Sequence, residues 1–185
     1  METLEAINKR TSLKTRLSAR EVEQEKIAKV LDAARLAPSA RNQQPWRFIV
    51  VKGKENVENV VTKAFFEFSQ AFKEASVLIF ACANPSEDDI HEGREYYLFD
   101  VGLAFKNMLL AATDLGLVTH PMTSVNEDEL KKVLHIPDEV RFVAATPLSY
   151  PIGSSYDEAA QEKLGQRTRK SLKEVAYSNV WGESS

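Results

Sequence analysis

Basic side chains and a hydroxyl alternate near the start of the chain, where Arg10, Ser12 and Lys14 occupy every second position. Alternate residues of an extended segment point to the same side. One face would then present a guanidinium, a hydroxyl and an ammonium group. This set suits a phosphate, because Arg binds its oxygens as a fork and Lys as a point charge. Taken alone, the segment is equally typical of a solvated basic stretch.

Arg167 and Arg169 repeat this alternation near the other end of the chain. If the tail folds back toward residue 10, Arg10, Lys14, Arg167 and Arg169 form one nest of cations. A solvated tail is the alternative, because runs of charge are usually exposed. Gly is scarce, at 7 residues, and the GxxxxGK[ST] spacing is absent, so neither a dinucleotide fingerprint nor a P-loop is predicted.

A second polar segment, residues 37–46, reads Ala-Pro-Ser-Ala-Arg-Asn-Gln-Gln-Pro-Trp. A helical pattern leads into it and an apolar run leaves it, so we expect a loop that joins a helix to a strand. Its side chains and backbone groups can hold a planar polar ligand by the edge. Pro, Ser and Asn are also ordinary turn residues, which leaves a plain turn as the alternative.

Hydrophobic periodicity predicts the elements that position these segments. Residues 76–83 are apolar nearly throughout, as in a strand covered on both faces. Residues 94–116 are apolar around most of the helical circumference, which predicts a central helix ending at Gly116. Intermixed helices and strands indicate an α+β or α/β fold. The remaining predicted helices are a short one carrying Leu4 and Ile7, 23–37, about 54–74 and 126–134, and the remaining strands are 46–52 and 140–148.

The bulk composition excludes several classes of function. The chain has 185 residues, 43% hydrophobic and 28% charged, which fits one domain with a proper core. A formal net charge of −3 without a basic stripe disfavours a nucleic-acid partner. The first residues do not resemble a signal peptide, and no apolar stretch approaches the ~20 residues that span a bilayer. We therefore expect no membrane association and a cytoplasmic location.

Other residue types that can do chemistry are isolated. Cys82, the single cysteine, lies in an apolar run, so we expect a buried thiol. No pair among His91, His120 and His135 has zinc-ligand spacing with Cys or Glu partners, so no metal is predicted. Residues 151–185 are mostly polar, yet large apolar side chains stand near their end. These side chains must dock on the chain's own core or on a second subunit; they are Val175, Tyr177, Val180 and Trp181.

These segments occur in the order seen in the nitroreductase-like family of FMN-dependent oxidoreductases, and the sequence resembles that family over nearly its whole length. Residues 9–14 resemble the family's Arg-x-Ser-x-Arg/Lys motif, which binds the FMN phosphate. Residues 31–46 resemble its helix ending in Pro-Ser-x-x-Asn-x-Gln-Pro-Trp, which is the most specific match. Residues 100–117 resemble the central dimer helix, residues 121–124 a stretch facing the flavin ring, and Arg167 and Arg169 a basic pair at the phosphate.

The resemblance implies an α+β, nitroreductase-like fold, in which helices flank a central, mostly antiparallel sheet. It also implies a long central dimer helix and an extended C-terminal tail. The whole chain, 1–185, would be a single flavin-binding domain, with a tail of about 152–185 wrapping the partner subunit. The implied assembly is a homodimer with FMN at the subunit interface.

The resemblance also implies the site. A backbone N–H near Ser124 would reach the flavin N5, and Lys14 is alternatively a cation near the pyrimidine end of the ring. NADH or NADPH would reduce the flavin, and an electron-poor acceptor such as a nitroaromatic or quinone would be reduced in a ping-pong cycle, without a nucleophilic residue. The implied phosphate ligands are Arg10, Ser12, Lys14, Arg167 and Arg169; the implied ring contacts are Pro38, Ser39, Ala40 and Asn42 from one subunit and Pro121, Thr123 and Ser124 from the other.

Two departures from the family pattern and two other functions stay open. Ser124 stands where Gly is frequent, which is compatible only with a φ that is not positive. Ser149 stands where Gly is usual before Tyr-Pro. A specialised relative, dehalogenase-like or flavin-destructase-like, would use reduced flavin differently. A flavin-binding sensor or store without efficient turnover would belong to another class.

Overall fold

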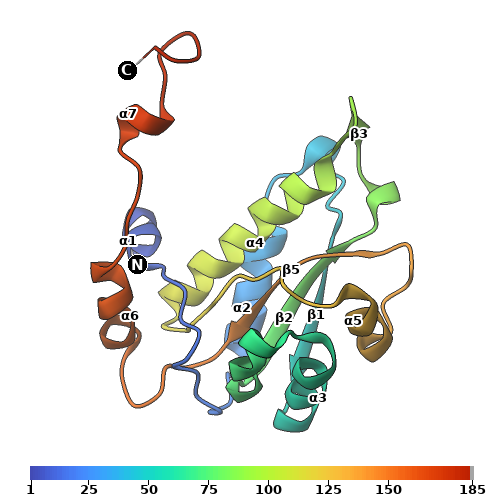
Figure 1. The fold of residues 1–185 in the computed structure, drawn as a ribbon, viewed down its shortest axis with the longest axis vertical. Coiled ribbons are helices and arrows are strands. Elements are labelled where there is room, and N and C mark those ends of the chain that lie inside the picture. The colour runs from blue at the N-terminus through green and yellow to red at the C-terminus, as the bar shows by residue number, and fades with distance from the viewer. Residues whose placement is uncertain (184–185) are drawn as a thin grey trace.

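A three-stranded antiparallel sheet forms the centre of the computed structural model, which describes residues 1–183 (Figure 1). The strands β1 (Trp46–Lys52), β2 (Val77–Ala83) and β5 (Arg141–Leu148) stand in the order β1-β2-β5. All three strands were predicted from the sequence, to within one residue. Isolated bridges join the chain around this sheet, Val118 pairing with Ser149 and Met122 with Ala145.

Helices cover both faces of β2, as its continuous apolar run predicted. Leu78, Phe80 and Cys82 belong to a core cluster shared with α3 (Lys54–Ala64) and α5 (Glu127–Leu134). Ile79 and Ala81 belong to a second cluster shared with α2 (Gln24–Arg35) and α4 (Tyr96–Asp114). The period-2 alternation of a strand therefore divides the core into two layers.

The central helix α4 ends as the sequence indicated. Gly116 has a φ of +73°, a left-handed conformation that suits Gly, and the N–H of Leu117 donates to the carbonyl of Ala112 at 2.9 Å. α5 is capped by Asn126, whose Oδ1 accepts the N–H of Glu129 at 3.1 Å. No helix in residues 1–183 is long and apolar enough to cross a membrane.

The single helix predicted over 54–74 is wrong. α3 ends at Ala64, and Phe65 is extended, with φ −96° and ψ 141°, before the 3₁₀ helix η2 (Glu67–Glu74). The Phe65 ring packs edge-on against Phe72 and Phe80. The Gln70 amide satisfies the carbonyls of Val61 and Phe65 at the break, which stabilises the interruption. Phe68 of η2 is 62% exposed.

The tail expected as extended from about 152 contains a packed helix, α6 (Tyr156–Gly165). Ser155 and Glu158 form a reciprocal capping box at its start, a signal readable in the sequence. Its Tyr156, Ala159 and Ala160 are buried. Only the chain after α6 is extended; it carries the four-residue α7 (Leu172–Val175) and stands away from the body in Figure 1.

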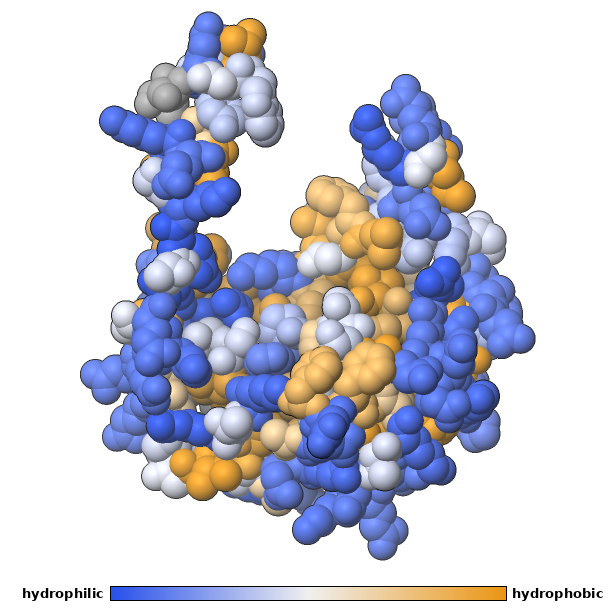
Figure 2. Space-filling view, in the orientation of Figure 1, coloured by the Kyte–Doolittle hydropathy of each residue, from blue (hydrophilic) through white to orange (hydrophobic). Residues whose placement is uncertain are grey.

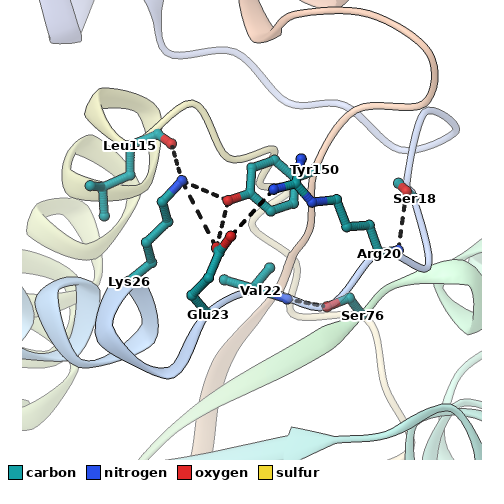
Figure 3. A network of polar contacts seen from close by, with 8 residues as sticks. All are labelled: Ser18, Arg20, Val22, Glu23, Lys26, Ser76, Leu115 and Tyr150. Carbon is teal, nitrogen blue, oxygen red and sulfur yellow. Dashed lines mark hydrogen bonds and ion pairs between the residues drawn. The ribbon is translucent and has the colours of Figure 1, made fainter.

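A polar network around Tyr150 holds the chain segment that leads into α2 (Figure 3). The Tyr150 hydroxyl donates to Glu23 Oε2 and accepts from Lys26 Nζ, both at 2.6 Å. Ser149 stands where the resemblance leads one to expect Gly, and its hydroxyl accepts the N–H of Ser76 at 2.9 Å.

Short elements complete the described chain: α1 (Thr3–Lys9), η1 (Ala40–Asn42), η3 (Pro85–Glu87), β3 (Ile90–His91) and β4 (Arg94–Glu95).

The burial of Cys82 gives a direct test of this core. The side chain is 1% exposed, and burial, with a smaller effect of Glu127, raises the pKa of the thiol to about 11. We expect no reaction with a disulfide reagent at pH 8 in the native protein, and one reactive thiol after unfolding in guanidinium, measured spectrophotometrically. Rapid native-state labelling would show that β2 is not covered on both faces.

Candidate functional site

The predicted alternation in the N-terminal segment is present. Thr11 and Leu13 are buried, whereas the alternate positions, Arg10, Ser12 and Lys14, are half-buried. Ser12 pairs with Thr119 in a parallel bridge, and the N–H of Leu13 donates to the Thr119 carbonyl at 3.0 Å. The buried positions therefore anchor the segment, and the basic ones share the other side.

Both ends of the chain meet at this segment, as the alternation of Arg167 and Arg169 suggested. The Tyr156 hydroxyl accepts the N–H of Thr11 at 3.0 Å and donates to the Lys9 carbonyl at 3.2 Å. Arg167 Nη2 donates to the Arg10 carbonyl at 2.8 Å. The tail therefore returns to residue 10 within one chain.

Three guanidinium groups gather where the ends meet. Arg10 Nη1 lies 3.4 Å from the Ser12 hydroxyl, and burial lowers the pKa of Arg10, with further lowering by Arg167 and Arg169. None of the three forms an ion pair with a carboxylate anywhere in residues 1–183. Clustered cations without a counter-charge are typical of an anion site.

Lys14 does not join this cluster. Its ammonium donates to the Phe68 carbonyl and lies 5.4 Å from the centre of the Phe68 ring, in η2. The pKa of Lys106 in α4 is lowered by burial and, less strongly, by the charges of Arg10 and Arg167.

The segment after Thr119 leads toward the exposed Pro121, Thr123 and Ser124. Ser124 is absent from the residues of positive φ, so its side chain fits the position where Gly is frequent. The His120 ring lies 5.4 Å from Phe72, and burial, then Lys14, lower its pKa, which leaves the imidazole neutral at pH 7. His120 Nδ1 and Thr119 Oγ1 are buried without a partner among the described residues.

The loop at residues 38–44 is tightly held and strained. Asp100 of α4, 1% exposed, accepts the N–H of Ala40 at 2.7 Å, and the Ser39 hydroxyl accepts the N–H of Gln44 at 2.9 Å. Arg41, Asn42 and Gln44 have positive φ values of 48°, 59° and 52°, which are uncommon outside Gly. Strain of this kind is typical of binding loops. The contact with Asp100 was not predicted, because Asp100 lies 60 residues away from Ala40.

A second carboxyl group lies beside Asp100. Burial raises the pKa of Asp88, and the charges of Asp100 and Asp89 raise it further. Asp88 Oδ2 is buried without a hydrogen-bond partner among the described residues. The Asp88 carboxyl group is therefore easier to protonate than an exposed one.

No hydrogen bond or ion pair within residues 1–183 joins the loop of residues 38–44 to the cation cluster. Asp100 holds the loop near the start of α4, whereas the amino group of Met1 pairs with Asp114 at its end, 2.8 Å away, and places α1 there. These two positions are about 21 Å apart at ~1.5 Å per residue. Figure 1 shows η1 and α1 at opposite ends of α4. A cavity of about 490 Å³ opens elsewhere, lined by Val22, Lys52, Lys73 and neighbours, and none of the predicted site residues lines it.

Comparison with known proteins agrees with this geometry. The model of the Nitroreductase family matches residues 7–84 and 66–150. A protein of Methanothermobacter thermautotrophicus, provisionally named an NADH dehydrogenase/NAD(P)H nitroreductase, is 35% identical over 156 residues, 82% of this chain and 78% of that protein. The chain belongs to the nitroreductase family. This membership confirms the resemblance, the predicted fold and the predicted oxidoreductase class.

Solved structures and one specialised relative extend the comparison. A nitroreductase family protein from Clostridium novyi NT matches with a TM-score of 0.77 and 34% identity, covering 100% of this chain and 97% of that chain. An oxidoreductase containing FMN matches with a TM-score of 0.78 and 27% identity, covering 97% and 92%. An iodotyrosine deiodinase of Thermotoga neapolitana is 29% identical over 144 residues, 65% of this chain and 74% of the deiodinase.

The Asp100 contact predicts a specific stability effect. Asp100→Ala leaves the Ala40 N–H without its acceptor, so we expect the free energy of unfolding to fall by about 1–3 kcal/mol, measured by urea denaturation. Asp100→Asn keeps an acceptor oxygen and should lose less. Asp32→Ala is the control, because Asp32 is exposed and pairs only with Arg35. Equal effects of the Asp32 and Asp100 substitutions would contradict this role.

Proposed function

We propose that the chain is an FMN-dependent NAD(P)H oxidoreductase that works as a homodimer with FMN at the subunit interface. The observation that carries the proposal is the cluster of Arg10, Arg167 and Arg169, which is drawn from both ends of the chain and has no carboxylate among the described residues to neutralise it. The proposal makes 1–185 one flavin-binding domain. The cytoplasmic location stays a prediction.

The donor set fits the phosphate of FMN. A flavin phosphate carries nearly two negative charges and several acceptor oxygens. Arg10, Arg167 and Arg169 supply guanidinium donors, and the Ser12 hydroxyl lies beside Arg10. Each such charge-assisted bond contributes about 1.5–3 kcal/mol before solvent exposure is discounted. Lys14 is proposed for the ring end rather than for the phosphate, since its contacts are with Phe68 and its charge acts on His120.

The remaining site residues are proposed to hold and shield the ring. Bound FMN would supply the hydride chemistry between NADH or NADPH and an electron-poor acceptor. Thr123 and Ser124 are exposed close to the bridged residues Val118 and Thr119, and their N–H groups donate to no other group in residues 1–183, so these N–H groups are free to bind a ligand edge. Neutral His120 adds no positive charge there. Pro121 precedes them on the same exposed stretch.

The loop carrying Pro38, Ser39, Ala40 and Asn42 supports the dimer. Its Pro38 and Asn42 are exposed, Asp100 holds its backbone, and it has no hydrogen bond or ion pair with the cation cluster among the described residues. A second copy would bring its loop to that cluster. Figure 2 shows apolar surface over the first half of α4 and on the projecting tail. The exposed apolar side chains there are Leu98, Phe99, Leu172, Val175, Val180 and Trp181.

The acceptor class has two candidates. The family and the Methanothermobacter relative favour a nitroaromatic or a quinone. The likeness to an iodotyrosine deiodinase favours reductive dehalogenation as the alternative. Turnover against nitro compounds, quinones and a halogenated tyrosine separates them. A flavin-binding sensor would bind FMN without rapid bleaching by NADH or NADPH.

The cation cluster can be tested through the flavin itself. We expect the purified protein to take up FMN, with absorbance near 450 nm, and to be bleached anaerobically by NADH or NADPH. Arg10→Ala should lower the FMN affinity by about tenfold or more, because it removes a half-buried cation from the phosphate. Arg35→Ala is the control, since Arg35 is exposed and bonds only Asp32. Full flavin retention in Arg10→Ala would contradict the phosphate assignment.

The tail provides a test of the assembly. Trp181 is 88% exposed and Leu172 78%, so a dimer that covers them gains apolar burial. We expect the wild type to sediment as a dimer. In the double variant Leu172→Ser/Trp181→Ser, the dissociation constant of the dimer should rise about tenfold. Ile152→Ser, an exposed apolar residue outside this segment, is the control. A wild type that is monomeric at every concentration would refute the homodimer.

A further inference from the structure

We propose that the exposed, stacked rings of Phe66 and Phe68 are the surface on which the enzyme binds a planar aromatic acceptor, with the ammonium of Lys14 beside them to meet an oxygen of that acceptor. The inference rests on the proposed function, because that function supplies the flavin that reduces the acceptor. It assigns the selection of acceptors to the segment where the long predicted helix is interrupted.

Two aromatic rings lie stacked on the surface at the start of η2. The ring centroids of Phe66 and Phe68 are 6.0 Å apart, and their planes are inclined by 26°. These side chains are 45% and 62% exposed, whereas the neighbouring Phe65 and Phe72 are buried. A stacked pair in water offers flat apolar surface that a further ring can cover, and ring contacts add binding energy beyond the area that they bury.

The backbone places Phe66 beside Ser124. Phe65 and Val125 form an antiparallel bridge, and Phe65 and Phe66 are both extended. In an antiparallel pair, the residue that follows Phe65 stands opposite the residue that precedes Val125. Because side chains alternate and Phe65 is buried, Phe66 and Ser124 share the exposed side.

Lys14 holds the other ring of the pair. Its ammonium donates to the Phe68 carbonyl and lies 5.4 Å from the centre of the Phe68 ring. It forms no ion pair with a carboxylate in residues 1–183. The rings are thus fixed to both segments proposed for the flavin ring, through Phe66 to that of Ser124 and through Phe68 to that of Lys14.

The chemistry of this surface selects one class of molecule. Flat rings favour a planar aromatic body, and an ammonium without a carboxylate favours a nitro, carbonyl or carboxylate oxygen attached to that body. Nitroaromatic acids and quinones carry both features. An acceptor that is not planar gains nothing from the rings, so the pair sets the choice among acceptors and not the rate at which the flavin is reduced.

The experiment compares a planar acceptor with one that does not stack. FMN-loaded enzyme is assayed anaerobically with NADH or NADPH against 4-nitrobenzoate and against ferricyanide, an octahedral ion. Phe66→Leu/Phe68→Leu keeps apolar bulk and removes the flat rings, so the kcat/KM for 4-nitrobenzoate should fall about 3- to 10-fold and that for ferricyanide should not change. Phe66→Tyr/Phe68→Tyr keeps the rings and should retain most of the activity with 4-nitrobenzoate.

Binding is also measured without turnover, by titrating oxidised enzyme with 4-nitrobenzoate and following the flavin spectrum. The Kd of the Leu variant should rise by the same factor as its kcat/KM falls. Ile90→Ala is the matched control, because Ile90 is an apolar residue of β3 that is also 62% exposed, and it should change neither quantity. Circular dichroism checks that each variant is folded.

Three results would overturn the role of the rings. Equal losses with both acceptors, or no loss with either, would exclude stacking of the acceptor. A lower FMN affinity in the Leu variant would show that the rings hold the flavin instead, and a weaker dimer in sedimentation with unchanged kcat/KM would show that a second copy covers them. If the wild type takes up no FMN or reduces neither acceptor, the proposed function fails and this inference falls with it.

Discussion

The contact that the candidate site depends on is the tie between the two ends of the chain. Arg10, Arg167 and Arg169 repel one another, so their charges alone would drive the segments apart. Hydrogen bonds from side chains to backbone groups hold the two segments together instead. The Tyr156 hydroxyl bridges the N–H of Thr11 and the carbonyl of Lys9, and the Arg10 carbonyl accepts from Arg167. Because Tyr156 is buried with α6 in the core, the energy that holds the cations comes from apolar packing.

The second constraint is the stiffness of α4. One helix anchors the loop of residues 38–44 through Asp100 near its start, and its far end, at Asp114, pairs with the amino group of Met1. Because a helix does not shorten, it keeps the loop and the start of α1 apart within the chain. The same helix leaves Leu98 and Phe99 exposed. A second copy related by two-fold symmetry would cover apolar surface and complete the site in one step, which is why site and assembly are proposed together.

Sequence patterns were reliable where structure follows local periodicity or local chemistry. The three strands, the end of α4 at Gly116 and the cap at Asn126 depend on neighbours within a few residues, and all were predicted. The break after Ala64 was not, because it depends on Phe72 and Phe80 packing around Phe65, and such contacts leave no period in the sequence. The contact of Asp100 was missed for the same reason, because its partner Ala40 lies 60 residues away.

Lys14 shows that alternation predicts the side of a segment but not the contacts of a long side chain. It does lie on the same side of its segment as Arg10 and Ser12, yet its flexible stem carries the ammonium to η2, where it bonds the Phe68 carbonyl. η2 is there because the long predicted helix breaks at Phe65, so the contact of Lys14 follows from an interruption that the sequence pattern missed. The cations of the candidate site therefore fall into two groups. The guanidinium groups of Arg10, Arg167 and Arg169 form one, and the ammonium of Lys14, whose charge acts on neutral His120, forms the other. The contacts of Lys14 are with a carbonyl and an aromatic ring rather than a carboxylate, so a ligand that offers it an anionic or carbonyl oxygen competes on favourable terms.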